Sequence, residues 1–451
     1  MTASSAKRPQ VSIQFDEQAQ RTKTRRQRQI QMKKFLFTTL FSNDLGLPSR
    51  TVPIAKELAK RGHEIAFCNP AQAPSKLIEE AGLDNLPLKL RSIPAVFAPS
   101  TTEVWNMDHF AALTGNLDEN FVRGTCEALM ALMTEHGAEV IVDSWNLCAC
   151  VAARALRKPL VTIIQADMHP GSRGFIWWKE PPRDVPTPVA VVNKVLVEHG
   201  LQPISKTAEL HAGDLTLVAG TPETDPLPEN VNVTYIGPML WQKPGAKLPD
   251  WVGTLSKERP VIWVYTGNPS YGPIAPWADS AVVLHACMAA LADEDVQVVL
   301  TTGHHALPEG IPSLPANFYY ESYVPGLAMA ERSDLLIHHG GHGVCLTGPY
   351  TGTPAVIIPT YSERESNARR IAALGAADFV VPAKGVSEER QVLVEEVRAK
   401  VRRVLSDPSF TLNARRVGEK MRTYGGASEA ARLIEDFAAR WQGVSESSPG
   451  V

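Results

Sequence analysis

The chain has 451 residues, of which 44% are apolar and 21% charged, and a formal net charge of −3. This balance is typical of a globular protein with room for two or three domains, and it excludes a fibrous or wholly disordered chain. No run of 18 or more apolar residues occurs, no secretory signal is present, and the six cysteines have neither zinc-site nor disulfide-scaffold spacing. These features predict a cytoplasmic protein without a membrane span.

The first 31 residues form a separate, basic segment. They carry seven Lys or Arg residues and two acidic residues, a net charge of +5, which leaves −8 for the rest of the chain. Their Gln, Arg and Ser content cannot build a core, so we predict a disordered tail. Such a tail could bind an anionic surface or act as a transit peptide, but we favour Met32 as the true start because "KFLFTTL" follows it directly.

Short apolar runs then alternate with helical patterns. Residues 34–40 read as a strand, residues 50–61 as a helix with Pro53 in its first turn, and residues 64–68 as the next strand. Further strands of the first half are predicted at 140–145, 160–164, 215–220 and 233–238. A Pro- and Gly-containing linker follows at 239–259. The strands of the second half are predicted at 260–267, 296–303, 317–324, 334–341, 355–359 and 378–382. This alternation predicts βαβ units in two α/β halves of roughly 200 residues, with a ligand cleft between the carboxyl edges of their parallel sheets.

The stretch "LLIHHGGHG" ends one of these strands. His338 and His339 close the strand, and Gly340 and Gly341 allow a tight turn into a helix, whose N–H groups would favour a phosphate or diphosphate. A metal site is disfavoured, because two adjacent histidines on a strand point to opposite faces and no carboxylate or cysteine stands at a ligand spacing. A histidine that merely satisfies the turn is the structural alternative.

Downstream, "PTYSERESNARR" places Glu363 and Glu365 at the start of another helix. Ionised carboxylates accept several hydroxyl hydrogen bonds, which suits a sugar beside the phosphate turn. Acids in the first turn of a helix also have a purely structural explanation, through the helix dipole.

The combined stretch "HHGGHGVCLTGPYTGTPAVIIPTYSERESNA" resembles the donor-binding signature of the UDP-glycosyltransferase superfamily. The matching positions are His339, Gly340, Gly341, Gly352, Pro354, Pro359, Glu363, Asn367 and Ala368. The pieces "RGHEI", "YIGP", "YVPG" and "YGGASEAARLIEDF" extend the resemblance over most of the chain from Met32. The doubled "HHGG" is most similar to the bacterial antibiotic-type and sterol-type branches.

This resemblance implies an α/β fold of two Rossmann-like domains, the GT-B arrangement. The expected parts are a tail (1–31), an acceptor-binding domain (32–238), a linker (239–259), a nucleotide-sugar-binding domain (260–422), a closing helix that returns to the first domain (423–443) and a second tail (444–451). It implies a hexosyltransferase that moves sugar with inversion and without metal from a UDP- or dTDP-linked sugar to a hydroxyl. We expect no cofactor beyond this cosubstrate and no nucleic-acid partner, while peripheral membrane contact stays open and no oligomeric state is predicted.

The resemblance also implies roles for the donor residues. His339, with the backbone of Gly340 and Gly341, would bind the diphosphate, and Glu363 would bind sugar hydroxyls. The remaining donor-site residues are Thr266, Gly267 and Asn268 at the phosphates, Tyr323 and Val324 at the nucleobase, and Gly343, Val344 and Arg364 around the turn and the sugar.

Three positions depart from the family pattern. Arg364 replaces a usual Gln, which makes a more polar or acidic sugar conceivable. Val344 replaces a Ser or Thr that often binds phosphate, and Thr347 replaces the ribose-binding Glu of the plant and animal branch. The identity of the donor therefore stays open.

The larger departure from the family pattern concerns the general base. An attacking hydroxyl needs its proton removed, and the family usually supplies a His, or in some members an Asp, in the loop after the first strand. That loop is "FSNDLGLPSR" here, so we predict Asp44 as the base, although Asn and Asp before Gly also suit a plain turn. Asp143 is the second catalytic candidate, as the base itself or a structural acid, and His109 and His169 are outside candidates.

Aromatic residues in probable loops of the first half predict a hydrophobic acceptor. The acceptor-binding candidates are Trp105, Phe110, His169, Phe175 and Trp177, next to Trp178. Such rings bury large areas at a cleft mouth, but core packing explains them equally well. The alternatives to a transferase are a catalytically silent nucleotide-sugar-binding relative or auxiliary partner, and an epimerase; a dehydrogenase is disfavoured because neither half opens with GxGxxG.

Overall fold

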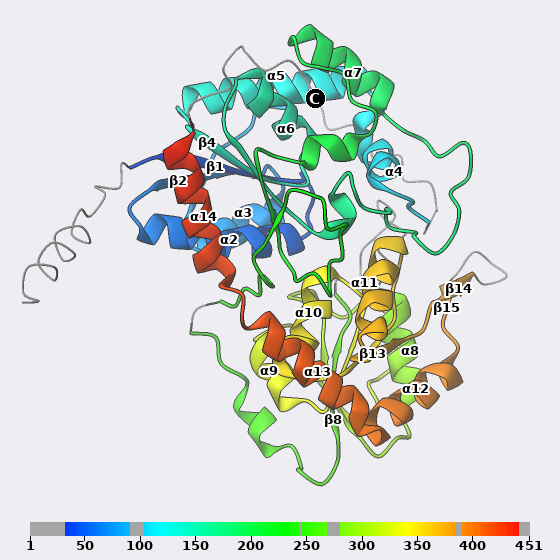
Figure 1. Ribbon diagram of the computed structural model, residues 1–451. Coiled ribbons are helices and arrows are strands. Elements are labelled where there is room, and N and C mark those ends of the chain that lie inside the picture. Colours follow the sequence, from blue (N-terminus) through cyan, green and yellow to red (C-terminus); the bar gives the residue numbers. More distant parts are fainter. Residues whose placement is uncertain (1–31, 91–102, 244, 268–279, 385–389, 442–451) are drawn as a thin grey trace, which may run out of the picture. The chain divides into compact units, whose positions relative to one another are not determined.

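Two parallel β-sheets, each covered by helices on both faces, dominate the computed structural model (Figure 1). The structure describes residues 32–90, 103–243, 245–267, 280–384 and 390–441. The chain divides into Met1–Lys33 and Lys34–Val451, and the contacts below all lie within the second unit. The tails predicted at 1–31 and 444–451 lie outside the described residues.

The first sheet has the strand order β3-β2-β1-β4-β5-β6-β7, with every pair parallel. Its strands are β1 (Lys34–Thr39), β2 (Glu64–Cys68), β3 (Asp84–Asn85), β4 (Val140–Ser144), β5 (Leu160–Ile164), β6 (Leu215–Val218) and β7 (Thr234–Tyr235). Its helices are α2 (Gly46–Lys60), α3 (Gln72–Glu80), α4 (Met107–Ala111), α5 (Glu119–Glu135), α6 (Leu147–Ala155) and α7 (Val189–Glu198).

Both faces of this sheet are buried because successive side chains of a strand point to opposite sides. Phe35 and Phe37 of β1 pack in one cluster with apolar residues of α2, and Leu36 packs in another with residues of α5 and α6. Strands that are covered on both faces read as continuous apolar runs, which is why they were predictable from sequence.

Helix α2 begins at Gly46, four residues earlier than predicted, so the expectation that Pro53 lies in its first turn is wrong. The Asp44 carboxylate accepts a hydrogen bond from the Gly46 N–H at 2.7 Å and forms the turn that starts the helix. Pro53 therefore lies inside the helix, where it lacks the N–H for one helical hydrogen bond. Leu47 and Pro48 before it are buried, so the helix begins where this first turn packs against the protein.

The second sheet has the order β10-β9-β8-β11-β12-β13, again with parallel pairs. Its strands are β8 (Val261–Tyr265), β9 (Gln297–Thr301), β10 (Phe318–Glu321), β11 (Leu335–His338), β12 (Ala355–Ile357) and β13 (Ala377–Phe379). Its helices are α8 (Ala281–Leu291), α9 (Gly326–Arg332), α10 (His342–Thr351), α11 (Ser362–Ala373), α12 (Val394–Ser406) and α13 (Pro408–Met421). A short antiparallel pair, β14 (Ala383–Lys384) and β15 (Arg390–Gln391), stands apart.

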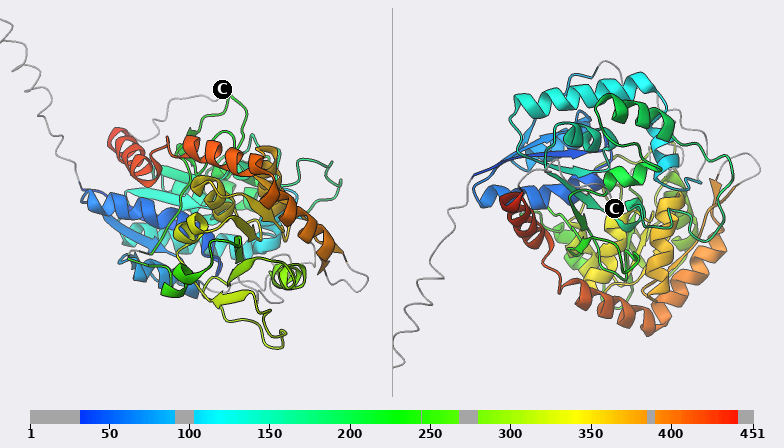
Figure 2. Two further views of the ribbon diagram at one scale, coloured as in Figure 1. Left: turned by 90° about the horizontal axis from the view of Figure 1, so that it is seen from below. Right: turned by 45° about the horizontal axis from the view of Figure 1, so that its top comes forward.

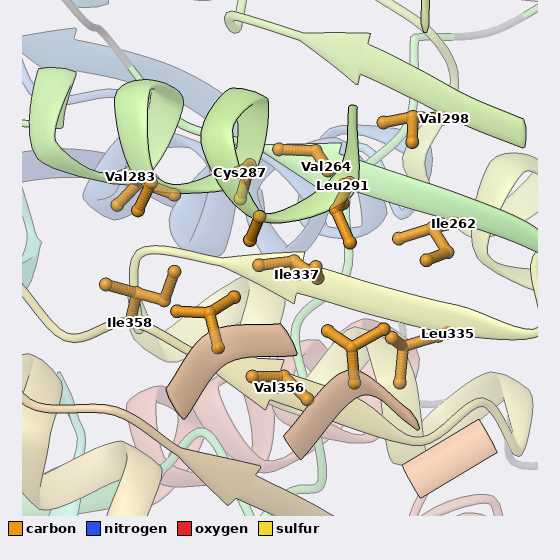
Figure 3. Close-up of a cluster of buried hydrophobic side chains, with 14 of the residues drawn as sticks. Ile262, Val264, Val283, Cys287, Leu291, Val298, Leu335, Ile337, Val356 and Ile358 are labelled. Atoms are coloured by element: carbon orange, nitrogen blue, oxygen red, sulfur yellow. The ribbon is translucent and has the colours of Figure 1, made fainter. Parts of the chain in front are cut away.

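Figure 3 shows one layer of this second core, where Val283, Cys287 and Leu291 of α8 lie over Val264 and Ile337 of the sheet. The opposite face packs against α9, α10, α11 and α13. The positions of β8 and β11 at the centre of the sheet bring their carboxyl ends next to each other.

Helix α14 (Gly426–Arg440) leaves the second half and returns to the first, as predicted, and both views of Figure 2 show it beside α2. Its buried residues Ala430, Ala431, Ile434 and Ala438 belong to the same cluster as Phe35 and Phe37. The α/β class with two helix-covered parallel sheets is therefore confirmed, while the exact domain and linker boundaries stay predictions.

All six cysteines are buried and unpaired in the structure. Among the described residues, no helix is both long and apolar enough to cross a membrane.

Candidate functional site

The turn between β11 and α10 is the centre of the predicted donor site. Gly340 has a φ of +90°, and a Cβ added to it would lie 2.8 Å from the carbonyl oxygen of Arg364. A Cβ on Gly341 would lie 2.7 Å from Nε2 of His339. Both positions therefore need glycine, and the turn they allow leads into α10 with no side-chain cap at its N-terminus. Its first N–H groups are available to an anion.

Both histidines of this turn are buried and neutral at ordinary pH. Burial lowers the pKa of His338 to about 3, and its Nδ1 accepts a hydrogen bond from the Gly340 N–H at 3.2 Å. Burial also lowers the pKa of His339 well below its usual value, and the charges of Arg364 and His338 lower it further. His339 would therefore meet a phosphate as a neutral hydrogen-bonding group.

The loop after β8 touches the same turn. Gly267 has a φ of +72°, and a Cβ at this residue would lie 3.1 Å from the His339 ring. Thr266 is fully buried, and its hydroxyl donates to the Gly267 carbonyl at 2.9 Å. The structure thus brings Thr266 and Gly267 to His339, whereas Asn268 lies outside the described residues.

Glu363, in the first turn of α11, joins the two halves. Its Oε1 accepts hydrogen bonds from Nδ2 of Asn367 at 2.8 Å and from Nε2 of Gln165, in the first half, at 2.9 Å. Asn367 also donates to the Gly340 carbonyl at 3.1 Å, which ties α11 to the glycine turn. Arg364 instead lies over the ring of Tyr361, with its guanidinium carbon 5.2 Å from the ring centroid.

The remaining predicted donor residues lie before α9 and in the first turn of α10. Tyr323 stacks on His304 with 4.1 Å between ring centroids, and Val324 is buried beside it. Val344 is also buried, whereas the Cβ position of Gly343 has no other heavy atom within 4 Å. Whether these residues contact a nucleotide stays a prediction.

The two candidate bases have opposite surroundings. Asp44 is exposed. Burial raises the pKa values of Tyr265 and Tyr361 in the second half, and the charge of Asp44 raises both further, for Tyr361 by less than the charge of Glu363. Asp143 is fully buried, and its carboxylate accepts hydrogen bonds from the Thr38 hydroxyl at 2.6 Å and the Asn146 N–H at 3.1 Å. The structure thus places Asp44 next to the donor half and encloses Asp143 in the core.

Burial raises the pKa of Asp143 to about 7, although its hydrogen bonds from Thr38 and Asn146 oppose this effect. The outside candidates His109 and His169 are also buried, and burial lowers the pKa of each. Each Nδ1 accepts a backbone hydrogen bond, from Trp105 and Gly171 respectively.

The predicted acceptor residues fall into two groups. Trp105, His169 and Trp177 line one pocket of about 340 Å³ in the first half. Phe110 and Phe175 instead pack with Trp145 in a buried cluster, where the Phe175 and Trp145 rings stack at 6.2 Å. Trp145 has a φ of +72°, an unusual conformation for a bulky residue at the end of β4.

The sequence analysis missed a buried polar cluster where the halves meet. Nη2 of Arg50 lies 3.1 Å from Nδ1 of His342, whose Nε2 lies 3.1 Å from Oδ1 of Asp225. Burial would raise the pKa of Asp225, but the charge and hydrogen bond of His342 and the charge of Arg370 lower it to about 2. Arg370 forms an ion pair with Asp167.

Only one signal in the sequence points to this cluster. Arg50 shares the apolar face of its helix with Ile54 and Leu58, where a charged residue is unexpected. Asp167, Asp225 and His342 carry no such local signal, because the fold brings them together from distant positions.

Comparison with known proteins agrees with this geometry. A family model described as "Erythromycin biosynthesis protein CIII-like, C-terminal domain" matches residues 285–437. A "PGL/p-HBAD biosynthesis glycosyltransferase" of Mycobacterium tuberculosis is 27% identical over 316 residues, which cover 64% of this chain and 68% of the relative. The "4'-demethylrebeccamycin synthase" of Lentzea aerocolonigenes is 30% identical over 215 residues, 48% of this chain and 46% of the relative.

A solved structure of CalG4, "the Calicheamicin Glycosyltransferase", has a TM-score of 0.69 at 20% identity and covers 91% of this chain and 100% of the other. The two sheets, the returning helix and this likeness define the GT-B fold. The named sequence relatives support a glycosyltransferase. Over residues 285–437 and beyond, the chain is similar in sequence to bacterial glycosyltransferases such as these two relatives.

Proposed function

We propose that the protein transfers a sugar, with inversion and without a metal, from a UDP- or dTDP-linked donor to a hydroxyl of a small hydrophobic acceptor. The observation that carries this proposal is the uncapped N-terminus of α10 beside buried His339, because it offers hydrogen-bond donors to a diphosphate. Glu363, the second residue of α11, would bind sugar hydroxyls in place of its hydrogen bond with Gln165.

The acceptor would enter from the pocket of Trp105, His169 and Trp177. Trp177 reaches the second half, since its Nε1 donates to the hydroxyl of Ser366 at 3.0 Å. Aromatic walls of this kind favour a flat or lipid-like molecule, because they bury a large area with little loss of side-chain entropy.

Asp44 is the proposed base, and Asp143 has a structural role in this proposal because its oxygens are already bonded inside the core. As the acceptor oxygen attacks the anomeric carbon, Asp44 takes its proton and the bond to the diphosphate oxygen breaks. Attack from the face opposite the leaving group inverts the anomeric configuration.

A metal is not needed in this proposal, because helix N–H groups meet the diphosphate charge. Among the described residues, the grouping of potential metal ligands is Asp143, Cys150 and His211, within 4.8 Å of one another and fully buried in the first half. It includes no residue of the turn between β11 and α10.

A silent nucleotide-sugar-binding relative is the second candidate. Val344 offers no hydroxyl in the first turn of α10, and Glu363 already holds two protein hydrogen bonds. Such a protein would bind the donor without releasing nucleoside diphosphate.

The test is a transfer assay on the full chain with UDP-glucose and dTDP-glucose and a panel of phenolic, macrolide and sterol acceptors. We expect acceptor-dependent release of nucleoside diphosphate that persists in EDTA. Asp44→Asn should lower the rate by about 100-fold to 10,000-fold, the usual effect of losing a base.

Asp118→Asn is the matched control, since Asp118 is another exposed aspartate whose carboxylate accepts N–H bonds at the start of a helix. Donor binding without release across the panel would favour the silent relative. A wild-type rate in Asp44→Asn would remove Asp44 from the mechanism, and loss of activity in EDTA would contradict a metal-free reaction.

A further inference from the structure

Arg50 is a buried cation at the meeting point of the two halves. It lies on α2, with only 6% of the residue exposed. Its Nη2 donates to Oε1 of Gln165 at 3.3 Å and lies 3.1 Å from Nδ1 of His342. Its Nη1 is buried and has no hydrogen-bond partner among the described residues.

The carboxylates around Arg50 are bonded elsewhere. Burial lowers the pKa of the Arg50 guanidinium, and the charges of Asp225, Glu363 and Asp44 oppose this effect. Asp225 is held by His342, Glu363 by Gln165 and Asn367, and Asp44 by the Gly46 N–H. A buried arginine stays charged, and an unsatisfied buried donor is costly. Such a group in a folded protein calls for an explanation.

The position of Arg50 indicates what satisfies Nη1. His342, its neighbour, is the first residue of α10, so the guanidinium lies at the uncapped end of that helix. A helix N-terminus and a guanidinium both favour anions, and the guanidinium fork is suited to phosphate oxygens. Two independent features, contributed by different halves of the chain, therefore point to one anionic ligand.

We propose that Arg50 binds the anionic part of the nucleotide-sugar donor and stabilises the negative charge of the leaving group. This inference rests on the proposed function. When the bond from the anomeric carbon to the diphosphate oxygen breaks, its electron pair stays on that oxygen, and the acceptor proton goes to Asp44. Arg50 keeps its own protons and contributes hydrogen bonds and charge.

The anionic oxygens could belong to the diphosphate or to a carboxylate on the sugar. The experiment separates these sources by titration calorimetry of the full chain with UDP, dTDP, uridine, thymidine, UDP-glucose and UDP-glucuronate. Arg50→Gln should weaken binding of nucleoside diphosphates by about 10-fold to 100-fold, as expected for a lost charged hydrogen bond, and leave nucleoside binding unchanged.

Arg50→Lys keeps the charge without the planar guanidinium group, so it should retain part of the affinity. Partial affinity in this variant would show that the loss in Arg50→Gln comes from the missing charge and not from misfolding. Arg61→Gln is the matched control, because Arg61 directly follows the same helix but bonds Glu435 and the Ser428 carbonyl of the α14 segment. It should bind all six ligands as the wild type does.

Each result has a distinct meaning. Weaker binding of UDP or dTDP supports a diphosphate contact. Weaker binding of UDP-glucuronate alone places the anion contact at the sugar and overturns the leaving-group role of Arg50. Unchanged binding of all ligands by folded Arg50→Gln overturns the inference while leaving the proposed function intact. If the wild type binds no nucleotide at all, the proposed function itself fails.

Discussion

Asp143 shows at the scale of one residue how burial makes stability depend on pH. Its pKa is about 7 in the fold because of burial, against about 3.9 for an unfolded aspartate. Between these values the unfolded chain is ionised and the folded chain protonated, so the unfolded state binds fewer protons. Asp143 therefore makes the free energy of unfolding fall as pH rises from about 4 to 7, by about 4 kcal/mol, and adds no slope above pH 7.

Asp143→Asn should remove this contribution. Urea unfolding at several pH values between 5 and 8 is expected to show the wild type losing stability relative to the variant as pH rises. Burial lowers the pKa of His211 to about 3, which gives the opposite slope below about pH 6.5. Parallel stability curves for the two proteins would contradict the prediction.

The glycine turn between β11 and α10 and the buried polar cluster of Arg50, His342 and Asp225 differ in how far their residues can be predicted from sequence. His339, Gly340 and Gly341 are neighbours in sequence, so their chemistry could be recognised in one short stretch. Arg50 and His342 stand 292 positions apart, and their contact exists only because the fold joins the two halves. No spacing in the sequence encodes it.

At the scale of elements, long apolar strands were predictable and short polar ones were not. Strands β2 and β5 match their predicted ranges, because buried parallel strands are continuous apolar runs. Strand β3 was missed, since its two residues Asp84 and Asn85 are polar and gain their conformation from pairing with β2. The start of α2 was missed for a similar reason, because packing overrides the signal of Pro53.

Helix α14 should contribute to the stability of the first half through Ile434. This side chain is fully buried in the cluster that contains Phe35 and Phe37, so Ile434→Ala should cost about 2–5 kcal/mol in the free energy of unfolding. Arg432→Ala on the same helix removes only exposed pairs with Glu429 and Asp436 and should cost about 0–1 kcal/mol. Urea unfolding of both variants measures the contrast, and equal losses would mean that α14 is not docked in solution.

At the scale of the whole molecule, the two halves share more than the returning helix. Gln165 bonds Glu363, Arg50 lies against His342, and Asp167 pairs with Arg370. These contacts are among several polar contacts that cross from the first half to the donor-binding elements. The sequence predicted two α/β halves and a cleft, but it did not predict these contacts, because each depends on how the halves meet. A ligand at the donor turn is therefore expected to act on both halves.

Hydrogen exchange measures this coupling directly. At saturating UDP or dTDP, we expect slower exchange in α10, which would bind the diphosphate, and also in α2, because bound phosphate would hold Arg50 and suppress local opening. In Arg50→Gln, with the nucleotide raised to equal occupancy, protection of α10 should persist while protection of α2 is lost. Helix α7 packs against α5, away from α2 and α10 (Figure 1), and serves as the internal reference. Protection confined to α10 in the wild type would show that the nucleotide is held by the second half alone, and Arg50 would then have no part in donor binding.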